Sequence, residues 1–253
     1  MISLCIPVCG RPEKLERLLC SLSLDLFSSI IIVNTSPAHH DQILQKYEEI
    51  SIKYHCTQLF SPWSGPSEAR QIGADKALAL GCDKILFLDE DLVARRDAIE
   101  NMIMLMNANE SIDICSGRWI DYRNDTQSER PLGFVYLESL RKNQLCIEKH
   151  RFKGAERSHP VQLHDVQASL LVKSSIFNKV RFDPEYQFFM ELFDFFFQCY
   201  NQQLKIYANP CSVFEHYPGS YQTGSQKREA GLKKLEAQKY FETKWGAIPI
   251  IGN

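Results

Sequence analysis

Residues 84–91 read Lys-Ile-Leu-Phe-Leu-Asp-Glu-Asp, an apolar run that ends in three consecutive carboxylates. The run from Lys84 to Leu88 has the length and composition of a strand buried on both faces, as strands of parallel sheets are. In open α/β sheets, ligands bind beyond the carboxyl ends of such strands. The segment therefore predicts an α/β fold with a polar site at Asp89, Glu90 and Asp91.

The sequence before this segment alternates short β-rich runs with helical patterns. The expected elements are strands over residues 3–8, 29–34 and 53–58 and helices over 13–22, 40–49 and 67–80. Leucines in the first of these helices recur at the i, i+3, i+4, i+7 spacing of one helix face. Such alternation predicts βαβ units that feed a mostly parallel central sheet flanked by helices.

The second half of the chain is less regular. Residues 121–160 are polar and lack a sustained period, which predicts a long loop or lid rather than a second core. Apolar segments then return, the first over 168–172, and the elements expected after it are a helix over 188–200 and short strands over 204–208 and 212–215.

The last segment predicts a helical tail. Residues 226–243 are rich in Lys, Glu, Gln and Ala, and Leu232, Leu235 and Tyr240 are its expected contacts to the body. The predicted organisation is a single domain over residues 1–220, with halves 1–119 and 120–220, followed by a tail over 221–253.

Composition excludes several classes of protein. With 253 residues, 44% hydrophobic, 24% charged and a net charge of −2, the chain is neither disordered nor basic enough to favour nucleic acid. No apolar run approaches the roughly 20 residues that span a bilayer, and the N-terminus lacks a signal-peptide pattern. The nine cysteines form no Cys-x-x-Cys pair, which favours reduced thiols. These features predict a cytoplasmic protein without a transmembrane anchor, and leave peripheral membrane contact open.

Three adjacent carboxylates repel one another unless something compensates their charge. A hard cation such as Mg²⁺ or Mn²⁺ does so, because it takes oxygen ligands and reaches phosphates through one or two carboxylates. The alternative interpretation of Asp89, Glu90 and Asp91 is a solvated acidic turn before the next helix.

Several segments, in their order and spacing, resemble family 2 glycosyltransferases of the GT-A fold. The resemblance covers about residues 1–220 and rests on Cys9–Pro12, Val33–Ser36, Gly65–Gly73, Ile85–Asp91, Phe188–Phe196 and Val213–Ser220. It implies transfer of a sugar from a nucleotide-diphosphate sugar to an acceptor hydroxyl, as in polysaccharide biosynthesis. The sugar is expected to be a hexose or an N-acetylhexosamine.

The resemblance also implies a set of donor-binding residues. The implied nucleotide-sugar contacts are Pro7, Val8, Arg11, Asn34, Arg70, Asp89 and Glu90. Pro7, Val8 and Asn34 would line the base pocket, for which uridine is favoured although the family more often has Asp in place of Asn34. Asp89 would contact the ribose or base side, and Glu90 would point away. Arg70 would lie near the phosphates; its alternative is a surface ion pair with Glu68 or Asp75.

The resemblance also implies metal ligands and suggests an aromatic contact for the substrate. Asp91 and His216 would bind Mn²⁺ or Mg²⁺, and a histidine that only caps its strand is the alternative. Trp119 is favoured over Trp63 and Tyr122 as the aromatic face for a sugar or acceptor. Lys227 and Arg228 are candidates to close over the diphosphate.

The base that activates the acceptor is expected on the helix over 188–200. Glu191 and Asp194 lie three residues apart and so share one side of that helix. Many family members have the base at the position of Leu192, so this chain departs from the pattern. Its Asp-Phe-Phe sequence resembles some N-acetylgalactosaminyltransferase-type members, which favours Asp194 as base with Glu191 as runner-up.

The sequence thus predicts a metal-dependent, inverting glycosyltransferase with a glycan or other hydroxyl acceptor. Two alternatives remain: a sugar nucleotidyltransferase, and a non-catalytic nucleotide- or glycan-binding module that kept the fold. For Glu191 and Asp194, the alternative is that both acids simply face water and have no catalytic role.

Overall fold

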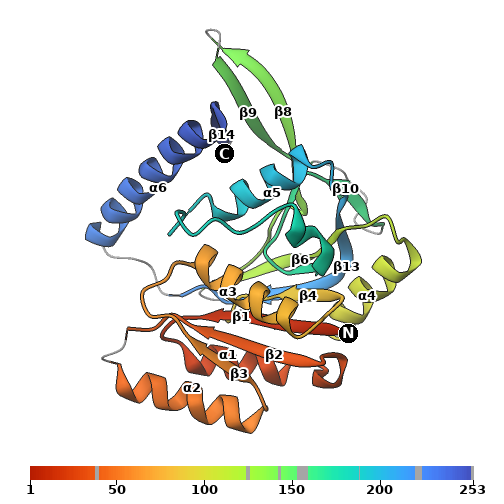
Figure 1. Ribbon diagram of the computed structural model, residues 1–253, viewed down its shortest axis with the longest axis vertical. Helices are drawn as coiled ribbons and strands as arrows, with labels where there is room; N and C mark the ends of the chain where they lie inside the picture. The colour runs from red at the N-terminus through yellow and green to blue at the C-terminus, as the bar shows by residue number, and fades with distance from the viewer. Residues whose placement is uncertain are drawn as a thin grey trace.

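The computed structural model places most of the chain in one α/β body (Figure 1). It describes residues 1–37, 40–123, 126–141, 144–152, 159–187, 189–219 and 224–251, with residues 224–230 and 251 described by their backbone alone.

The N-terminal half builds the parallel part of a large mixed sheet. Its strands run in the order β3-β2-β1-β4 and are β1 (Ile2–Val8), β2 (Ser29–Asn34), β3 (Thr57–Phe60) and β4 (Lys84–Phe87). β1 pairs in parallel with both β2 and β4, and β2 pairs in parallel with β3. The βαβ alternation expected from the sequence is confirmed.

The sheet continues beyond β4 with strands from the second half of the chain. The order there is β4-β12-β6-β13-β10, with β12 (Leu170–Lys173), β6 (Ile114–Arg123), β13 (Ile206–His216) and β10 (Val161–Leu163). β12 is antiparallel to both neighbours, whereas β13 is parallel to β6. The two short strands expected over 204–208 and 212–215 are one strand, because a bulge between Asn209 and Val213 shifts its register without ending it.

Helices cover both faces of the sheet. α1 (Pro12–Cys20), α2 (Asp41–Lys53) and α4 (Ala98–Ala108) pack on one face, and α3 (Pro66–Ala79) and α5 (Glu191–Asn201) on the other. Side chains of a strand alternate between its faces, so Leu4 and Ile6 meet Leu18 of α1 while Cys5 faces α3. A Cβ on Gly73 would lie 3.3 Å from the Cβ of Cys5, which shows how closely α3 approaches the sheet.

The region 121–160 is not the loop that its composition predicts. β7 (Thr126–Glu129) pairs with β6, and β8 (Gly133–Arg141) pairs with β9 (Gln144–Arg151) in a hairpin that rises from the body (Figure 1). The hairpin belongs to a second sheet in the order β11-β8-β9-β14, with β11 (Asp165–Val166). The prediction was wrong because only part of each strand is buried: Tyr136 faces the core, whereas Leu137 and Leu140 are exposed.

The C-terminal segment is a helix, as predicted, and then a strand. α6 (Gly224–Trp245) is followed by β14 (Ala247–Ile251), which pairs in parallel with β9. Ala237 and Phe241 are the buried contacts of α6, whereas the expected contacts Leu232 and Leu235 are 62% and 56% exposed. The expected contact through Tyr240 is confirmed, since its ring packs 5.0 Å from that of Tyr186.

The remaining elements are short. They are η1 (Leu24–Leu26), β5 (Leu92–Ala94) and η2 (Ser174–Asn178). The helix expected over 188–200 begins at Glu191; Phe188 lies outside the described residues, and Phe189 and Met190 have φ of 65° and 62°.

Candidate functional site

A cleft of about 900 Å³ opens at the carboxyl ends of β1 and β4, where α5 faces them. Most of the site residues expected from the sequence line it: Pro7, Val8, Arg11, Arg70, Asp89, Glu90, Asp91, Glu191 and His216. Asn34, Trp119 and Asp194 do not line it. Lys227 and Arg228 lie outside the residues whose side chains are described.

Arg70 joins two carboxylates of the cleft. It is only 3% exposed; one terminal nitrogen donates to Asp89 at 2.7 Å and the other lies 3.7 Å from Glu191. Its Nε and Nη1 make no hydrogen bond in the described part of the chain, so donors remain for a ligand. The alternative of a surface pair with Glu68 or Asp75 does not describe this side chain.

Glu191 is the acidic residue of α5 that faces the cleft. Its side chain is 16% exposed and lies at the first turn of the helix. Burial raises the pKa of its carboxyl, and the nearby Arg70 offsets part of this rise. A carboxylate with a raised pKa at the wall of a cleft is suited to accept a proton.

Glu90 stabilises the loops around the cleft through its hydrogen bonds. Its carboxylate accepts hydrogen bonds from Tyr47 Oη at 2.9 Å, Arg11 Nε at 2.7 Å and the backbone N–H of Cys9 at 3.2 Å. Burial raises its pKa despite these donors. Glu90 therefore holds the turn between β1 and α1.

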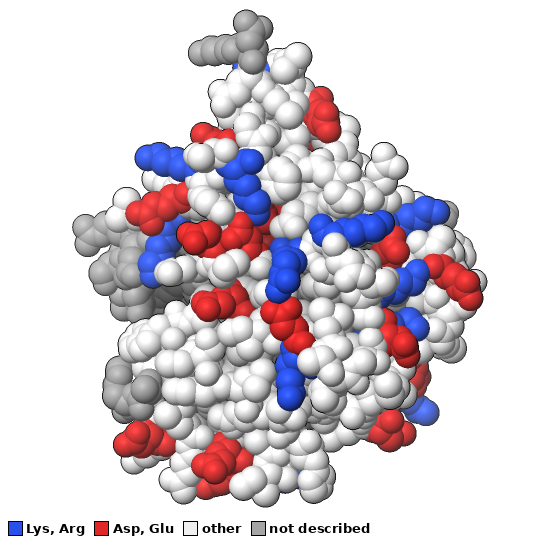
Figure 2. All heavy atoms as spheres, in the orientation of Figure 1, with Lys and Arg blue, Asp and Glu red and all other residues white. Residues whose placement is uncertain are grey.

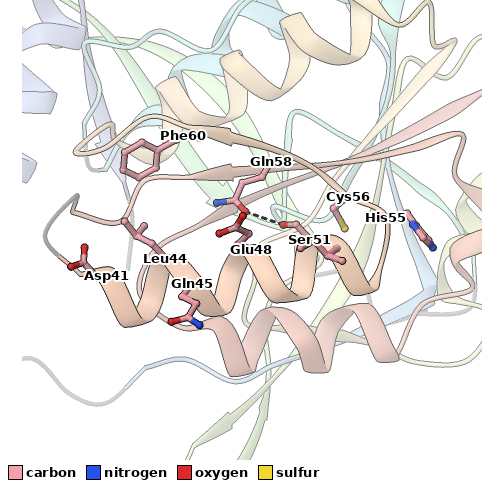
Figure 3. Close-up of a pocket in the computed structure, with 10 residues that line it drawn as sticks. Asp41, Leu44, Gln45, Glu48, Ser51, His55, Cys56, Gln58 and Phe60 are labelled. Carbon is pink, nitrogen blue, oxygen red and sulfur yellow. Dashed lines mark hydrogen bonds between the residues drawn. The ribbon is translucent and has the colours of Figure 1, made fainter.

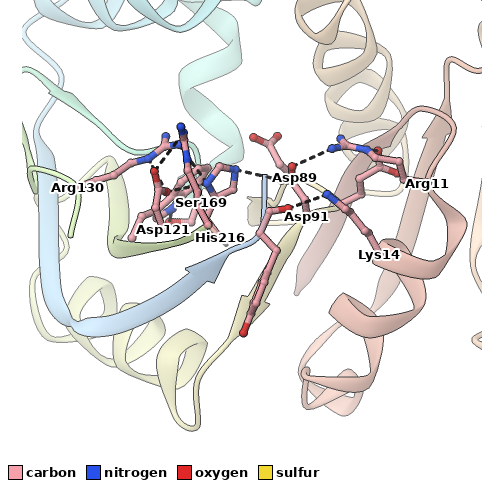
Figure 4. Close-up of polar contacts among 12 residues, drawn as sticks. Arg11, Lys14, Asp89, Asp91, Asp121, Arg130, Ser169 and His216 are labelled. Carbon is pink, nitrogen blue, oxygen red and sulfur yellow. Dashed lines mark hydrogen bonds and ion pairs between the residues drawn. The ribbon is translucent and has the colours of Figure 1, made fainter. Parts of the chain in front are cut away.

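Asp91 lies between two groups of polar side chains (Figure 4). On one side Arg11 Nη1 is 3.0 Å from Asp91 Oδ2, and on the other His216 Nε2 is 3.6 Å from Asp91 Oδ1. The carboxyl is buried, which raises its pKa, but His216 and Arg11 outweigh this and lower it. The backbone N–H of Tyr217 donates to the carbonyl of Asp91, which ties the end of β13 to this position.

The ring of His216 is oriented by polar contacts on the side facing away from Asp91. Its Nδ1 lies 2.8 Å from Asp121 Oδ1 and 3.1 Å from Arg130 Nη2. Arg130 donates to the same oxygen at 2.8 Å. The other ring nitrogen, Nε2, faces Asp91. Metal-binding histidines typically have this carboxylate on the remote nitrogen.

The donors at this point fit a divalent cation. Asp91 supplies oxygen and His216 supplies nitrogen, both of which Mn²⁺ accepts. Among the described residues, no group of three or more His, Cys, Asp and Glu side chains gathers as a ligand set. The remaining ligands would have to come from a bound phosphate or from water.

Two expected contacts lie elsewhere. Trp119 is buried behind His216, with ring centroids 4.9 Å apart and its N–H donating to Ser169 at 3.0 Å, so it does not offer a face to a sugar. Trp63, which is 68% exposed, is the tryptophan that lines the cleft. Asn34 is fully buried, and its side-chain oxygen accepts from the backbone N–H of Ser36.

Asp194 is not placed to act on a substrate in the cleft. Its carboxylate is fully buried and accepts hydrogen bonds from four donors: Tyr186 Oη at 3.2 Å, Gln198 Nε2 at 2.7 Å, Lys244 Nζ at 2.9 Å and Trp245 Nε1 at 2.7 Å. The preference for Asp194 over Glu191 is therefore reversed by the geometry: both lie on α5, but only Glu191 reaches the cleft.

Several residues that shape the site were not predicted. Arg130 and Lys149 line the cleft from the region that was expected to be a loop, and Tyr47 reaches Glu90 from α2. Lys149 is paired with the buried Asp165 at 2.5 Å. No local pattern marks them, because each reaches the site only through long-range strand pairing or helix packing.

A second hollow, of about 1030 Å³, lies over α2 and β3 (Figure 3). It shares no lining residue with the cleft. Asp41 and Glu48 are its acids, and they lie about two turns apart on α2, too far to act on one atom. Two of its polar side chains meet each other, since Ser51 Oγ lies 3.0 Å from Gln58 Oε1 (Figure 3).

Charges on the surface are mixed. Figure 2 shows basic and acidic side chains interspersed over one face, with no broad field of one sign. Among the helices of the described chain, none combines the length and hydrophobicity that a bilayer crossing requires.

Comparison with known proteins agrees with this geometry. The family model for glycosyl transferase family 2 matches residues 3–168. Similar solved structures include GalNAc-T7 with UDP, GalNAc and Mn²⁺, at a TM-score of 0.66 and 14% identity, covering 96% of this chain and 50% of that one. TarS 1–349 of S. aureus is similar at a TM-score of 0.58 and 14% identity, covering 97% of this chain and 73% of that one. A search of curated protein sequences found no match.

Proposed function

The chain belongs to glycosyl transferase family 2 and has the GT-A fold, and from this premise we propose a metal-dependent, inverting transfer of a sugar from a UDP-sugar to an acceptor hydroxyl. The activity proposed for the chain is accordingly that of a glycosyltransferase. It spans half the length of the GalNAc-T7 chain, so the substrates of the complete protein belong to the proposal.

The donor is proposed to bind along Pro7, Val8, Thr35, Asp89 and Arg70. The free N–H groups of Arg70 are suited to oxygens of the nucleotide-sugar, and Asp89 to its hydroxyls. The UDP in the GalNAc-T7 structure supports a uridine donor. The sugar is proposed to be a hexose or an N-acetylhexosamine.

Asp91 and His216 are proposed to hold the cation. When bound, the metal would neutralise the charge that develops on the departing diphosphate. The orientation of His216 by Asp121 and the Mn²⁺ in the GalNAc-T7 structure support this assignment.

Glu191 is proposed as the base. It would take the proton of the acceptor hydroxyl while that oxygen bonds to the anomeric carbon, and the bond to the diphosphate oxygen would break with its electron pair. A single displacement of this kind inverts the anomeric configuration. The acceptor is proposed to be a glycan or another hydroxyl compound.

One observation carries the proposal: Asp89, Asp91, Glu191 and His216, brought from three separate segments, face one cleft. The proposal is tested by a thermal-shift panel of nucleoside diphosphates and nucleotide-sugars with and without Mn²⁺, since a ligand of the native state raises its stability. We expect a Mn²⁺-dependent shift with uridine compounds. The absence of a shift with every nucleotide would contradict the proposal.

A non-catalytic binding module is the second candidate, and the observation that favours it is Leu192 at the family's usual base position. Release of UDP from a UDP-sugar in water, lost in Glu191→Gln, separates an enzyme from such a module. For a sugar nucleotidyltransferase, the panel would instead show binding of a nucleoside triphosphate.

A further inference from the structure

The turn that delivers Glu191 to the cleft is strained. Phe189 and Met190 precede it, and both have positive φ, which is unfavourable for residues with a side chain. Such a conformation persists only where surrounding contacts over-determine it. The contacts that hold this turn therefore also decide where the carboxylate of Glu191 lies.

Asp194 and Tyr186 close the turn on itself. The Tyr186 hydroxyl donates to Asp194 Oδ1 at 3.2 Å, which joins the residues before and after the strained pair. The backbone N–H of Asp194 donates to the carbonyl of Met190 at 2.8 Å. Glu191 lies inside this closed segment, three residues before Asp194.

Residues at the end of α6 hold the segment between Tyr186 and Asp194 in place. Lys244 bridges Asp194 Oδ2 at 2.9 Å and Asp183 Oδ2 at 2.6 Å, and the indole N–H of Trp245 donates to Asp194 Oδ1 at 2.7 Å. The Asp194 carboxylate is completely buried. Two of the four donors to Asp194 come from α6, and a buried carboxylate that loses donors is strongly disfavoured, so the docking of α6 stabilises Asp194 in this position.

Aromatic packing makes the docking specific. The ring of Phe241 packs 5.0 Å from Phe193 and 5.3 Å from Phe197, and Trp245 packs edge-on to Phe197 at 5.2 Å. α6 thus contacts the same helix, α5, whose first residue is Glu191. Lys233, also on α6, lines the cleft itself.

We propose that Lys244 and Trp245 are positioning residues for the transfer reaction: through Asp194 they hold the first turn of α5 so that Glu191 faces Arg70 and the acceptor. This inference rests on the proposed function of Glu191. It makes α6 and β14 a part of the catalytic unit and gives Asp194 a supporting role.

The experiment compares Lys244→Met and Trp245→Phe with two controls. Lys239→Met removes an exposed lysine of the same helix, and Lys244→Arg keeps a cation beside Asp194. The readouts are the kcat of UDP-sugar hydrolysis with water as acceptor, the Kd of UDP with Mn²⁺, and hydrogen exchange of the Asp194 amide.

We expect Lys244→Met and Trp245→Phe to lower kcat about tenfold or more and to speed exchange of the Asp194 amide by a similar factor. The Kd of UDP should change less than about twofold. Both controls should retain most of the rate. Trp245→Phe keeps an aromatic ring in the packed position, which favours a folded variant.

Three results would overturn the inference: an unchanged kcat in both variants, a slower reaction with unchanged exchange, or an equal loss in UDP affinity. If the unmodified protein neither binds nor consumes any nucleotide-sugar, the proposed function fails instead. Hydrogen exchange would still report in that case whether Lys244 and Trp245 hold α5.

Discussion

The two halves of the molecule are assembled in different ways. In the N-terminal half, β1 pairs with β2 and β2 with β3, so strands that follow one another along the chain lie side by side. In the C-terminal half, β14 pairs with β9, about 100 residues earlier, and Trp245 reaches Asp194. The first half is organised mainly by successive strands, with β4 returning to pair with β1, whereas the second half depends more on contacts between distant segments.

The cleft lies where these halves meet, and each supplies a different part of it. Asp89 and Asp91 follow a strand of the first half, whereas Glu191 and His216 come from the second. Donor binding should therefore depend mainly on the first half together with His216, and the chemical step on the second. The following experiments test this division.

The largest effect is expected for Glu191→Gln. Loss of the base should lower kcat about 10²- to 10⁴-fold, because a positioned proton acceptor contributes that much. The Kd of UDP with Mn²⁺, measured by calorimetry, should stay within about twofold. Full activity in Glu191→Gln would contradict the claim that the chemical step depends on this residue of the second half.

Phe241→Ala and Leu232→Ala test whether α6 belongs to the body. Phe241 is fully buried, so its truncation should cost about 3–5 kcal/mol, whereas the exposed Leu232 should cost less than about 0.5 kcal/mol. Denaturant unfolding followed by circular dichroism measures both. Equal, small effects would show that α6 is an appendage.

Leu18→Ala provides the matching test in the first half. Leu18 is fully buried between α1 and the sheet, and its truncation should cost about 2–5 kcal/mol. A single unfolding transition in both Leu18→Ala and Phe241→Ala would show that the halves unfold together. Two separate transitions would instead sharpen the contrast between them.

Asp91→Ala should weaken Mn²⁺-dependent binding of UDP about 100-fold, since even indirect partners of metal ligands contribute 10- to 100-fold. Asp25→Ala, which alters an exposed carboxylate of η1, is the control. Calorimetry with and without Mn²⁺ separates the two. Metal-dependent binding that survives in Asp91→Ala would exclude Asp91 as a ligand.

The smallest effect concerns pH. Burial raises the pKa of Glu191, and the facing charges are Arg70, which lowers it, and Asp89, which raises it further. The base is active when ionised, so kcat should fall as pH drops through a value above the ordinary glutamate pKa of about 4.3. In Arg70→Gln this acid limb, measured at saturating donor, should move to higher pH. If the acid limb of the kcat profile has its midpoint at the ordinary glutamate pKa, or moves to lower pH in Arg70→Gln, Glu191 is not the group whose ionisation controls the rate.

Much of the first half could be predicted because its signals are local. The period of the leucines in α1 and the apolar run before Asp89 each reflect burial against a neighbouring element. The hairpin β8–β9 was missed because its buried residues are few and do not alternate with exposed ones, so the sequence shows no period of two.

The site residues were also predicted only in part. The resemblance to family 2 glycosyltransferases singled out Asp91, His216 and Glu191, and all three line the cleft. It also favoured Asp194 over Glu191 as base. The contacts that bury Asp194 come from Lys244 and Trp245, some 50 residues away, so no local pattern could show them.

By itself, the sequence determined the parallel sheet, its helices and the carboxylates at the strand ends, because short-range periodicity encodes which side of each element is buried. Only the tertiary structure decided that Glu191 lines the cleft whereas Asp194 is held by donors from α6. Burial and hydrogen-bond partners depend on residues that are far apart in the chain. No local pattern of residue types carries that information.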